Sequence, residues 1–340
     1  KNNNNKQRKN MNNFKKIGMT ALAASLVSTS VFAGELTASG SASVTAEGWG
    51  GKDLNKERGL SMADSVVLSG STELDNGMTV SMSFELDSDN GGTSSYDDKS
   101  VSVSSDTFGT LKLAGHGGSS ATSAVDATAA GNIYDNFDGD AGADGNGLTS
   151  AGVNLLAAAG GANNLYYSLP AMVDGLAMNA SLNTAGATGN NALGFNVIYT
   201  GVEGLSLTYA QADIESGVSS TSGDHTVMNA SYAYGPVTVA YTNSDYDTGA
   251  ANTRALAQEV TSYAISYTVS DAISLTYGTE TIESGLASEV TDAEYEGITA
   301  SYTAGGMTIS LTSQDAENID HGTNADEDYE YWALGLSFAF

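Results

Sequence analysis

A group of oxygen-bearing side chains near the middle of the chain is the feature best suited to bind an ion. Asp135, Asp138, Asp140 and Asp144 lie close together in sequence, with amide side chains between and after them up to Asn146. Carboxylate and amide oxygens are the ligands that Ca²⁺ takes. The spacing differs from that of a twelve-residue calcium loop, and no bidentate glutamate follows. The pattern therefore favours a solvated acidic loop, with a calcium site as the weaker alternative.

Catalytic chemistry has little support elsewhere in the sequence. The histidines are His116, His225 and His321, each at an expected strand end or in a loop, and no two are spaced for zinc. No Gly-x-Ser-x-Gly nucleophile motif occurs. The glycine-rich segments 115–118 and 142–147 precede no helix that could cradle phosphate. We therefore expect no enzyme and no cofactor, and a hydrolase built from Asp and His at a rim is the weaker alternative.

The charge balance excludes further classes of partner. The 340 residues include 40 Asp and Glu but only 12 Lys and Arg, for a net charge of −28. A field of this sign repels the phosphates of nucleic acid and of anionic lipid headgroups. There is no cysteine, so a disulfide framework, a thiol nucleophile and a cysteine metal site are all excluded.

The N-terminal segment predicts export. Residues 1–10 form a low-complexity leader, either translated or an artefact of the assigned start. From Met11, a basic stretch precedes an apolar run that ends at Ala33, as in a cleaved signal peptide. The run is shorter than the ~20 apolar residues that a transmembrane helix needs. We expect residues 11–33 to be the signal peptide and residues 34–340 to be the mature domain, which keeps 6 basic residues and a net charge of −34.

The last twelve residues, 329–340, combine two faces of opposite character. From Tyr331 onward, one parity is wholly apolar, and the other holds mostly small residues. Successive side chains of a strand point to opposite faces, so the pattern predicts a strand with one apolar face. It resembles the closing strand of bacterial outer-membrane β-barrels, and an edge strand of a soluble sandwich is the alternative. The apolar parity consists of Trp332, Leu334, Leu336, Phe338 and Phe340.

Segments of about ten residues with alternating hydrophobicity recur along the mature chain, separated by turn residues, as in membrane barrels. The chain contains 40 glycines and only two prolines, Pro170 and Pro236, both between expected strands. Short connectors alternate with longer acidic ones, as expected when turns occupy one rim of a barrel and loops the other. The expected strands are 36–47, 66–74, 78–86, 99–106, 110–116, 163–169, 176–184, 192–200, 205–213, 225–234, 237–245, 260–269, 273–283, 293–304, 307–314 and 329–340.

These strands predict an all-β fold, an antiparallel transmembrane β-barrel of about sixteen strands. Lipid requires every backbone group to pair internally, so an exported β chain with apolar outward faces must close on itself. A barrel of this size is too wide for side chains to fill and leaves an aqueous channel. The expected inward residues, mostly Ser, Thr, Asn and Asp, agree with a water-filled lumen.

Three segments, 65–78, 106–113 and 163–170, together with the terminal Phe340, resemble the general porins of Gram-negative bacteria. The resemblance covers essentially all of the mature sequence. It implies that the third external loop, 117–162 here, folds into the lumen and narrows it. It also implies a homotrimer in the outer membrane, in contact with outer-membrane lipid.

One departure from the family concerns positive charge at the constriction. Relatives place an arginine just before the third loop, where this chain reads Lys112-Leu-Ala-Gly-His116, and the mature chain contains only Arg58 and Arg254 as arginines. The family's ion selectivity therefore does not carry over. Low-dielectric walls focus the field of the loop aspartates and concentrate cations. We expect the constriction to contain Asp126, Asp135, Asp138, Asp140, Asp144, Lys112, His116 and Arg58.

The function expected from this pattern is passive diffusion of ions and small hydrophilic solutes through a cation-preferring pore. The alternative is an acidic structural or adhesive surface protein without an open pore. The apolar end of the chain is expected to be the signal read by the barrel-assembly machinery, through Phe340, Phe338, Leu336 and Trp332.

Overall fold

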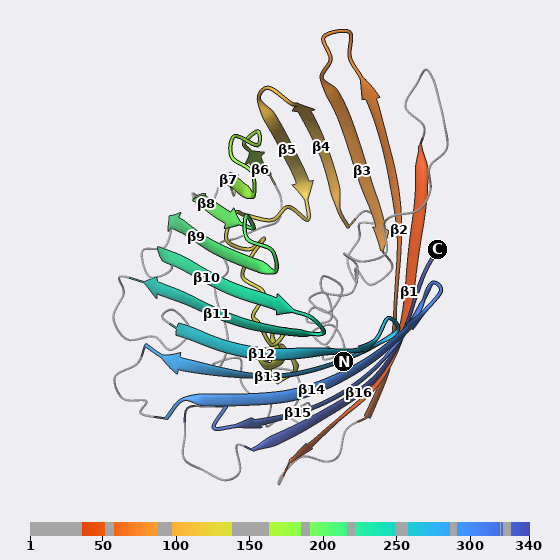
Figure 1. Ribbon diagram of the computed structural model, residues 1–340, viewed down its shortest axis with the longest axis vertical. Helices are drawn as coiled ribbons and strands as arrows, with labels where there is room; N and C mark the ends of the chain where they lie inside the picture. The colour runs from red at the N-terminus through yellow and green to blue at the C-terminus, as the bar shows by residue number, and fades with distance from the viewer. Residues whose placement is uncertain are drawn as a thin grey trace, which may run out of the picture.

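The computed structural model is a closed β-barrel of sixteen antiparallel strands (Figure 1). Each strand pairs with its neighbours in sequence, and β1 pairs with β16 to close the ring. The all-β prediction and the strand number are confirmed. The structure describes residues 36–51, 58–87, 97–137, 163–184, 191–215, 222–248, 258–285, 291–319, 321 and 328–340. The signal peptide and the leader expected from the sequence lie outside these residues.

The strands agree with the expected segments to within a few residues, except that β2 begins eight residues earlier, at Arg58. One short 3-10 helix, η2 (Ile133–Asn136), lies in the third loop. No helix among the described residues is long and apolar enough to cross a membrane. The strands are β1 (Thr37–Gly51), β2 (Arg58–Glu73), β3 (Thr79–Asp87), β4 (Lys99–Ser105), β5 (Gly109–His116), β6 (Asn164–Ser168), β7 (Leu176–Thr184), β8 (Asn191–Tyr199), β9 (Leu205–Glu215), β10 (Gly223–Tyr234), β11 (Val237–Thr248), β12 (Gln258–Ser270), β13 (Ile273–Ser284), β14 (Ala293–Ala304), β15 (Met307–Glu317) and β16 (Tyr329–Ala339).

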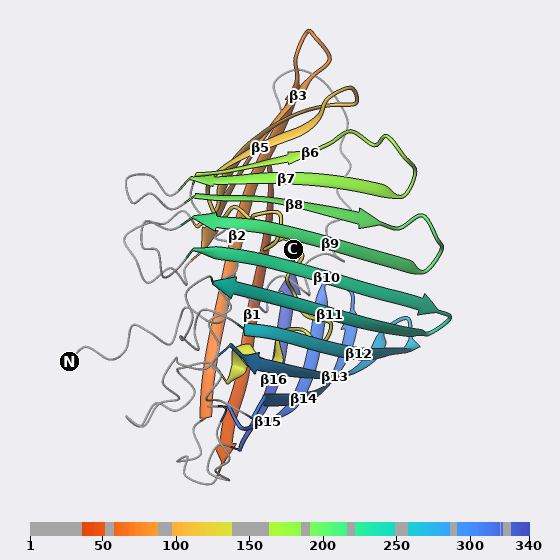
Figure 2. The same cartoon turned by 90° about the vertical axis from the view of Figure 1, so that its left-hand side faces the viewer.

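Short turns occupy one rim of the barrel, as Figure 2 shows for the β6–β7, β8–β9 and β10–β11 connections. The turn between β2 and β3 illustrates the chemistry. Gly77 adopts a φ of 80°, which side chains disfavour, and the Leu74 N–H donates to the Met78 carbonyl over 2.7 Å. The longer connections, including that between β5 and β6, leave from the opposite rim.

Side chains alternate between the lumen and the outside along every strand. In β16, Trp332, Leu334 and Phe338 face outward and are 41–44% exposed, whereas Tyr331 faces the lumen and is buried. Large apolar residues are similarly exposed on the outward faces of the other long strands. An exposed apolar band around a closed barrel is the surface that lipid covers.

The seam between β1 and β16 depends on two glycines. The ring of Phe340 occupies the space beside Gly40, where a Cβ would approach it to 2.4 Å. The indole of Trp332 similarly covers Gly48, where a Cβ would lie 2.7 Å from Nε1. Small outward residues on β1 therefore make room for aromatic rings of the same chain.

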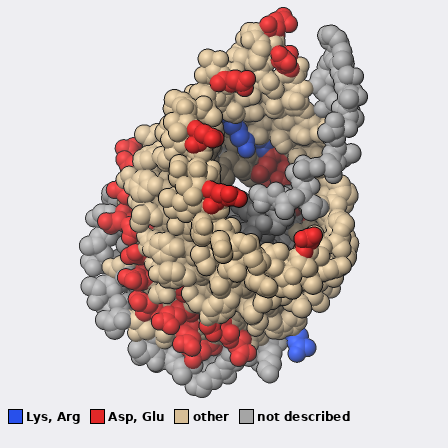
Figure 3. Space-filling view, in the orientation of Figure 1, with Lys and Arg blue, Asp and Glu red and all other residues tan. Residues whose placement is uncertain are grey.

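Acidic residues gather on the outside of the barrel near the long-loop rim (Figure 3). Strand register places many of them directly opposite one another on the outward parity. The facing pairs are Asp213 with Asp224, Asp224 with Asp247, Asp245 with Glu259, Glu259 with Glu283, Glu294 with Glu317, Glu296 with Asp315, and Asp315 with Glu330.

Candidate pore constriction

The described part of the third loop, 117–137, turns into the barrel and follows its inner wall. Its first contacts are with β7 and β8. The Ala121 N–H donates to Ser181 Oγ over 2.7 Å, and Asn196 Nδ2 donates to the Ala121 carbonyl over 2.7 Å. Further along, Asn229 Nδ2 of β10 donates to the Val125 carbonyl over 2.6 Å. These polar wall residues hold the loop backbone directly.

A buried glutamate on β13 is the central anchor of the loop. Glu280 is 1% exposed, and its carboxyl accepts hydrogen bonds from the Thr128 hydroxyl and, over 3.1 Å, from the Tyr134 N–H. Beside it, the Ala130 N–H donates to Ser262 Oγ over 3.0 Å. One wall side chain thus holds the loop both before η2 and within it.

The last described turn of the loop reaches the seam of the barrel. Asn136 Nδ2 donates to Gln314 Oε1 of β15 over 2.6 Å, and Trp49 Nε1 of β1 donates to the Asn136 carbonyl over 2.9 Å. The loop therefore crosses the interior from β7 to β1. The prediction that it folds into the lumen is confirmed for the described residues.

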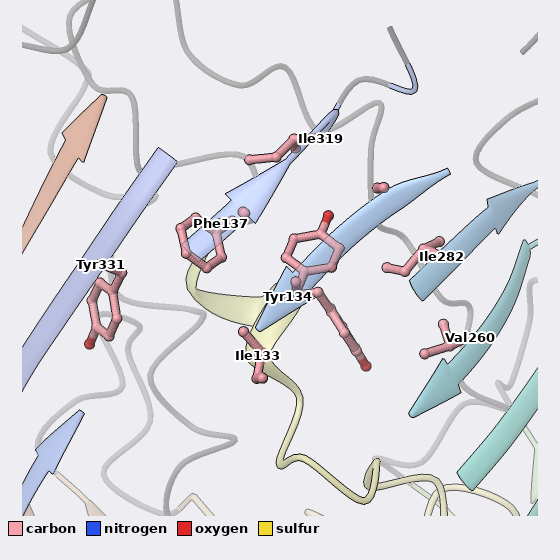
Figure 4. Close-up of a cluster of buried hydrophobic side chains, with 10 residues drawn as sticks. Ile133, Tyr134, Phe137, Val260, Ile282, Ile319 and Tyr331 are labelled. Atoms are coloured by element: carbon pink, nitrogen blue, oxygen red, sulfur yellow. The ribbon is translucent and has the colours of Figure 1, made fainter. Parts of the chain in front are cut away.

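An apolar cluster beneath the loop fixes its position (Figure 4). Phe137 is completely buried, with its ring centroid 5.8 Å from that of Tyr295 and 6.4 Å from that of Tyr331. Val260 and Ile282 point inward from β12 and β13 and belong to the same cluster. The sequence predicted inward residues that are mostly polar and no apolar patch on the inner wall. The wall is apolar beneath the loop because the loop buries apolar side chains against it.

Glycines in the wall allow the loop to approach closely. A Cβ at Gly278 of β13 would lie 2.4 Å from the Cβ of Ala130. One at Gly297 of β14 would lie 2.8 Å from Cγ of the neighbouring wall residue Gln314 and 3.2 Å from Cδ1 of Ile133 in the loop. Both positions face inward, where any other residue would push against the loop. Glycine at these two positions of β13 and β14 therefore leaves the space that the loop occupies.

The wall opposite the loop is lined by hydroxyl groups. Strand register places Ser69, Ser83 and Ser100 in one inward row across β2, β3 and β4. Ser71, Ser81 and Ser102 form the next row, which continues to Lys112 of β5. Hydroxyls both donate and accept hydrogen bonds, so this wall can replace part of the hydration of a passing solute.

A pocket of about 130 Å³ at the long-loop end of this wall combines charges of both signs. Glu85, Asp98, Lys99, Lys112 and His116 all line it. Burial raises the pKa of Asp98 above its usual value, and the carboxylates of Asp97 and Glu85 raise it further. His116 and Lys112 lower the pKa of Asp98.

The expected constriction residues divide into four groups. Lys112 and His116 share the pocket on β5, and Asp126 and Asp135 lie in the loop within the barrel. Arg58 is not brought together with them, because it shares the outward parity of Leu60 and Met62 and is exposed. Its parity could have been recognised had the expected strand been extended back to residue 58. Asp138, Asp140 and Asp144, and with them most of the calcium candidate, lie outside the described residues.

Several residues of the site were missed by sequence reasoning. Glu280 and Trp49 occupy inward positions of strands, and no local motif marks either as a loop anchor. For Asp98, the sequence does contain a signal that it lies near His116. In a regular β4–β5 hairpin that starts from the Ser105–Gly109 pair, Asp98 would lie directly opposite His116. A bulge at Lys99 shifts this register by one residue.

Only one histidine among the described residues lies beside a serine in a way that suggests a nucleophile. His225 Nε2 lies 2.9 Å from Ser244 Oγ, but each residue is only 2% exposed. No substrate can reach this pair, so it has a structural role in joining β10 to β11.

Comparisons with known proteins give a consistent result. A family model described as Gram-negative porin matches residues 18–340. No curated protein matches the chain. Among solved structures, a multiply substituted porin of Rh. blastica shares 15% identity with a TM-score of 0.63, covering 90% of this chain and 100% of that one. An anion-selective porin from Comamonas acidovorans shares 15% identity with a TM-score of 0.64, covering 91% and 100%. At these identities, the likeness to the solved structures establishes the fold alone.

Proposed function

The chain belongs to the family of Gram-negative porins, and from this premise we propose that its outer-membrane channel prefers cations and also passes small neutral solutes. The observation that carries the preference is the imbalance of charge around the described lumen. Lys112 is the cationic side chain that acts on Asp98 in the pocket lined by Glu85, Asp98 and His116. Lys99 also lines this pocket, but its side chain lies beside Gly115 on the outward parity. The loop inside the barrel adds Asp126 and Asp135 and contains no Lys or Arg among its described residues.

The physical basis for the preference is field focusing. A narrow aqueous path between low-dielectric walls concentrates the potential of fixed charges and raises the local density of counter-ions. The range of each charge is ~8 Å at physiological ionic strength and shrinks as salt is added. The preference is therefore strongest in dilute electrolyte. The hydroxyl rows of β2 to β4 add a neutral surface along which polar solutes move without a charge requirement.

Reversal potentials across a planar bilayer under a salt gradient test this proposal. The wild-type channel is expected to show a cation-selective potential that declines as both salt concentrations rise. The double variant Asp126→Asn, Asp135→Asn is expected to show a smaller cation-selective potential. Asp75→Asn is the matched control, because it removes one carboxylate from an exposed short turn on the opposite rim. Anion selectivity in the wild type, or an unchanged potential in the double variant, contradicts the proposal.

We further propose that export proceeds by cleavage after Ala33, that the barrel-assembly machinery recognises the end of β16, and that the protein is a homotrimer in contact with outer-membrane lipid. The exposed apolar band supports the lipid contact, and the trimer is the usual state of the family. Mass spectrometry of the purified barrel gives its N-terminus, and cross-linking in native membranes gives the subunit number. An intact N-terminus or a monomer contradicts the corresponding part.

A further inference from the structure

Two aspartates and a histidine converge at the long-loop mouth of the barrel, outside the third loop. Asp97 and Asp98 directly precede β4, and His116 is the last residue of β5. His116 Nδ1 lies 3.9 Å from Oδ1 of Asp97 and 3.9 Å from Oδ1 of Asp98. One donor atom from each of the three residues lies within 4.8 Å of the others. The side chains are between 27% and 49% exposed, so the cluster is open to the lumen.

The backbone holds this cluster in place. The Asp97 N–H donates to the Glu85 carbonyl over 3.0 Å, and the Glu85 N–H donates to the Asp98 carbonyl over 2.7 Å, which extends the β3–β4 pairing past the end of β4. On the other side, Gly117 adopts a φ of 65°. A Cβ at Gly117 would lie 1.5 Å from Oδ1 of Asp98, so only glycine leaves room for this carboxylate. The approach of Asp98 to His116 is thus built into the hairpin.

The donor set matches a particular class of metal ion. One imidazole nitrogen with two carboxylate oxygens suits zinc and the neighbouring divalent transition metals. Zinc lies about 2.0–2.2 Å from such ligands, which places tetrahedral ligand atoms roughly 3.4 Å apart. Partly exposed side chains can close the two 3.9 Å distances by small rotations. Ca²⁺ takes 6–8 oxygens, more than this cluster offers.

Charges around the cluster favour a bound cation at close range and oppose it further away. Asp97, Asp98 and Glu85 place three carboxylates near one imidazole, and their mutual repulsion falls when a cation lies between them. Lys112 lines the same pocket and repels that cation. Metal affinity is therefore expected to be moderate and sensitive to Lys112.

We propose that Asp97, Asp98 and His116 form a binding site for a divalent transition-metal ion at the outer mouth, with solvent in the remaining coordination position. The bound ion adds positive charge beside Lys112 and so weakens the preference for cations. The effect on permeation rests on the proposed channel function. Metal binding itself does not.

Calorimetric titration of the folded, detergent-solubilised barrel with Zn²⁺ tests the site directly. We expect one saturable site per chain in the wild type. His116→Ala and Asp98→Asn should each weaken its affinity by about tenfold or more, since losing a ligand costs at least as much as losing its orienting partner. Asp75→Asn, the charge-matched control on the opposite rim, should bind like the wild type. Lys112→Met should bind a few-fold more tightly, which no loss of folding would produce.

Equal Zn²⁺ affinity in the wild type and His116→Ala, or no saturable binding in the wild type, overturns the site. For the effect on permeation, reversal potentials are recorded with and without Zn²⁺. A shift toward anions that is absent in His116→Ala supports the effect, and no shift in the wild type overturns it. Should the protein form no channel, the proposed function fails while the calorimetric result still decides the metal site.

Discussion

Gly40 and Phe340 exchange two backbone hydrogen bonds, and the phenyl ring of Phe340 lies over the glycine. The Gly40 N–H donates to the Phe340 carbonyl over 2.7 Å, and the Phe340 N–H donates to the Gly40 carbonyl over 3.0 Å. The pair lies next to the last registered positions of β1 and β16, so it completes the ladder that closes the ring. Phe340 thereby pairs with Gly40, which lies near the start of the described structure.

The first prediction concerns this closure. Phe340→Ala should leave export intact but lower the amount of folded barrel, because β16 must be recognised and then paired with β1. Gly40→Ala should act in the same direction but more weakly, since its methyl only displaces the ring. The heat-dependent change in gel mobility of outer-membrane fractions measures the folded share. Wild-type assembly of Phe340→Ala would show that the aromatic end has no role.

The second prediction concerns the central loop anchor. Glu280→Gln preserves the size of the side chain but replaces one acceptor oxygen with a donor, which cannot accept from Thr128 or Tyr134. Each lost hydrogen bond costs about 1 kcal/mol, with a further cost for any donor left buried. We expect the loop to leave the wall part of the time, giving noisier single-channel currents.

Glu283→Gln is the matched control, because Glu283 lies on the same strand with its side chain exposed on the outward face. Indistinguishable current noise in the two variants would contradict the anchoring role of Glu280.

The third prediction concerns the space that Gly278 provides. Gly278→Ala introduces a methyl group 2.4 Å from the Cβ of Ala130, closer than two carbons can approach. The loop is expected to shift toward the pore axis and lower the single-channel conductance. Gly50→Ala is a suitable control, because its nearest neighbour would be a side-chain oxygen of Glu330 at 3.3 Å. A conductance equal to that of the wild type would mean that β13 yields instead of the loop.

The fourth prediction concerns the seam end of the loop. Trp49→Phe keeps an aromatic ring to pack on Tyr331, whose ring centroid lies 5.2 Å from that of Trp49. It removes the N–H that donates to the Asn136 carbonyl. The expected loss is about 1 kcal/mol of local loop stability, with the barrel itself unaffected. Limited proteolysis should cut the third loop faster, while the thermal midpoint of the barrel stays constant. A lowered midpoint would instead assign Trp49 to barrel stability.

Alternation predicted the strands well, because lipid outside and water inside impose opposite requirements on successive residues. Residues 293–304 were expected as a strand and form β14 with the same bounds. Alternation failed to predict the inward residues where a segment distant in sequence packs against the inner face of a strand. Val260 and Ile282 point into the lumen, where they share one buried cluster with the loop residues Ile133 and Phe137. No residue within β12 or β13 indicates that the loop completes this cluster. The Asp97–Asp98–His116 cluster was missed for a related reason, since it depends on a hairpin register that a bulge modifies.

The facing carboxylates on the outer rim make the barrel responsive to the salinity of its surroundings. Register holds pairs such as Asp245 with Glu259 and Glu296 with Asp315 side by side on adjacent strands, where like charges oppose pairing. Dissolved salt shortens the reach of this repulsion. Added salt therefore favours pairing of the strands up to the rim, whereas dilute electrolyte leaves the repulsion that opposes this pairing unscreened.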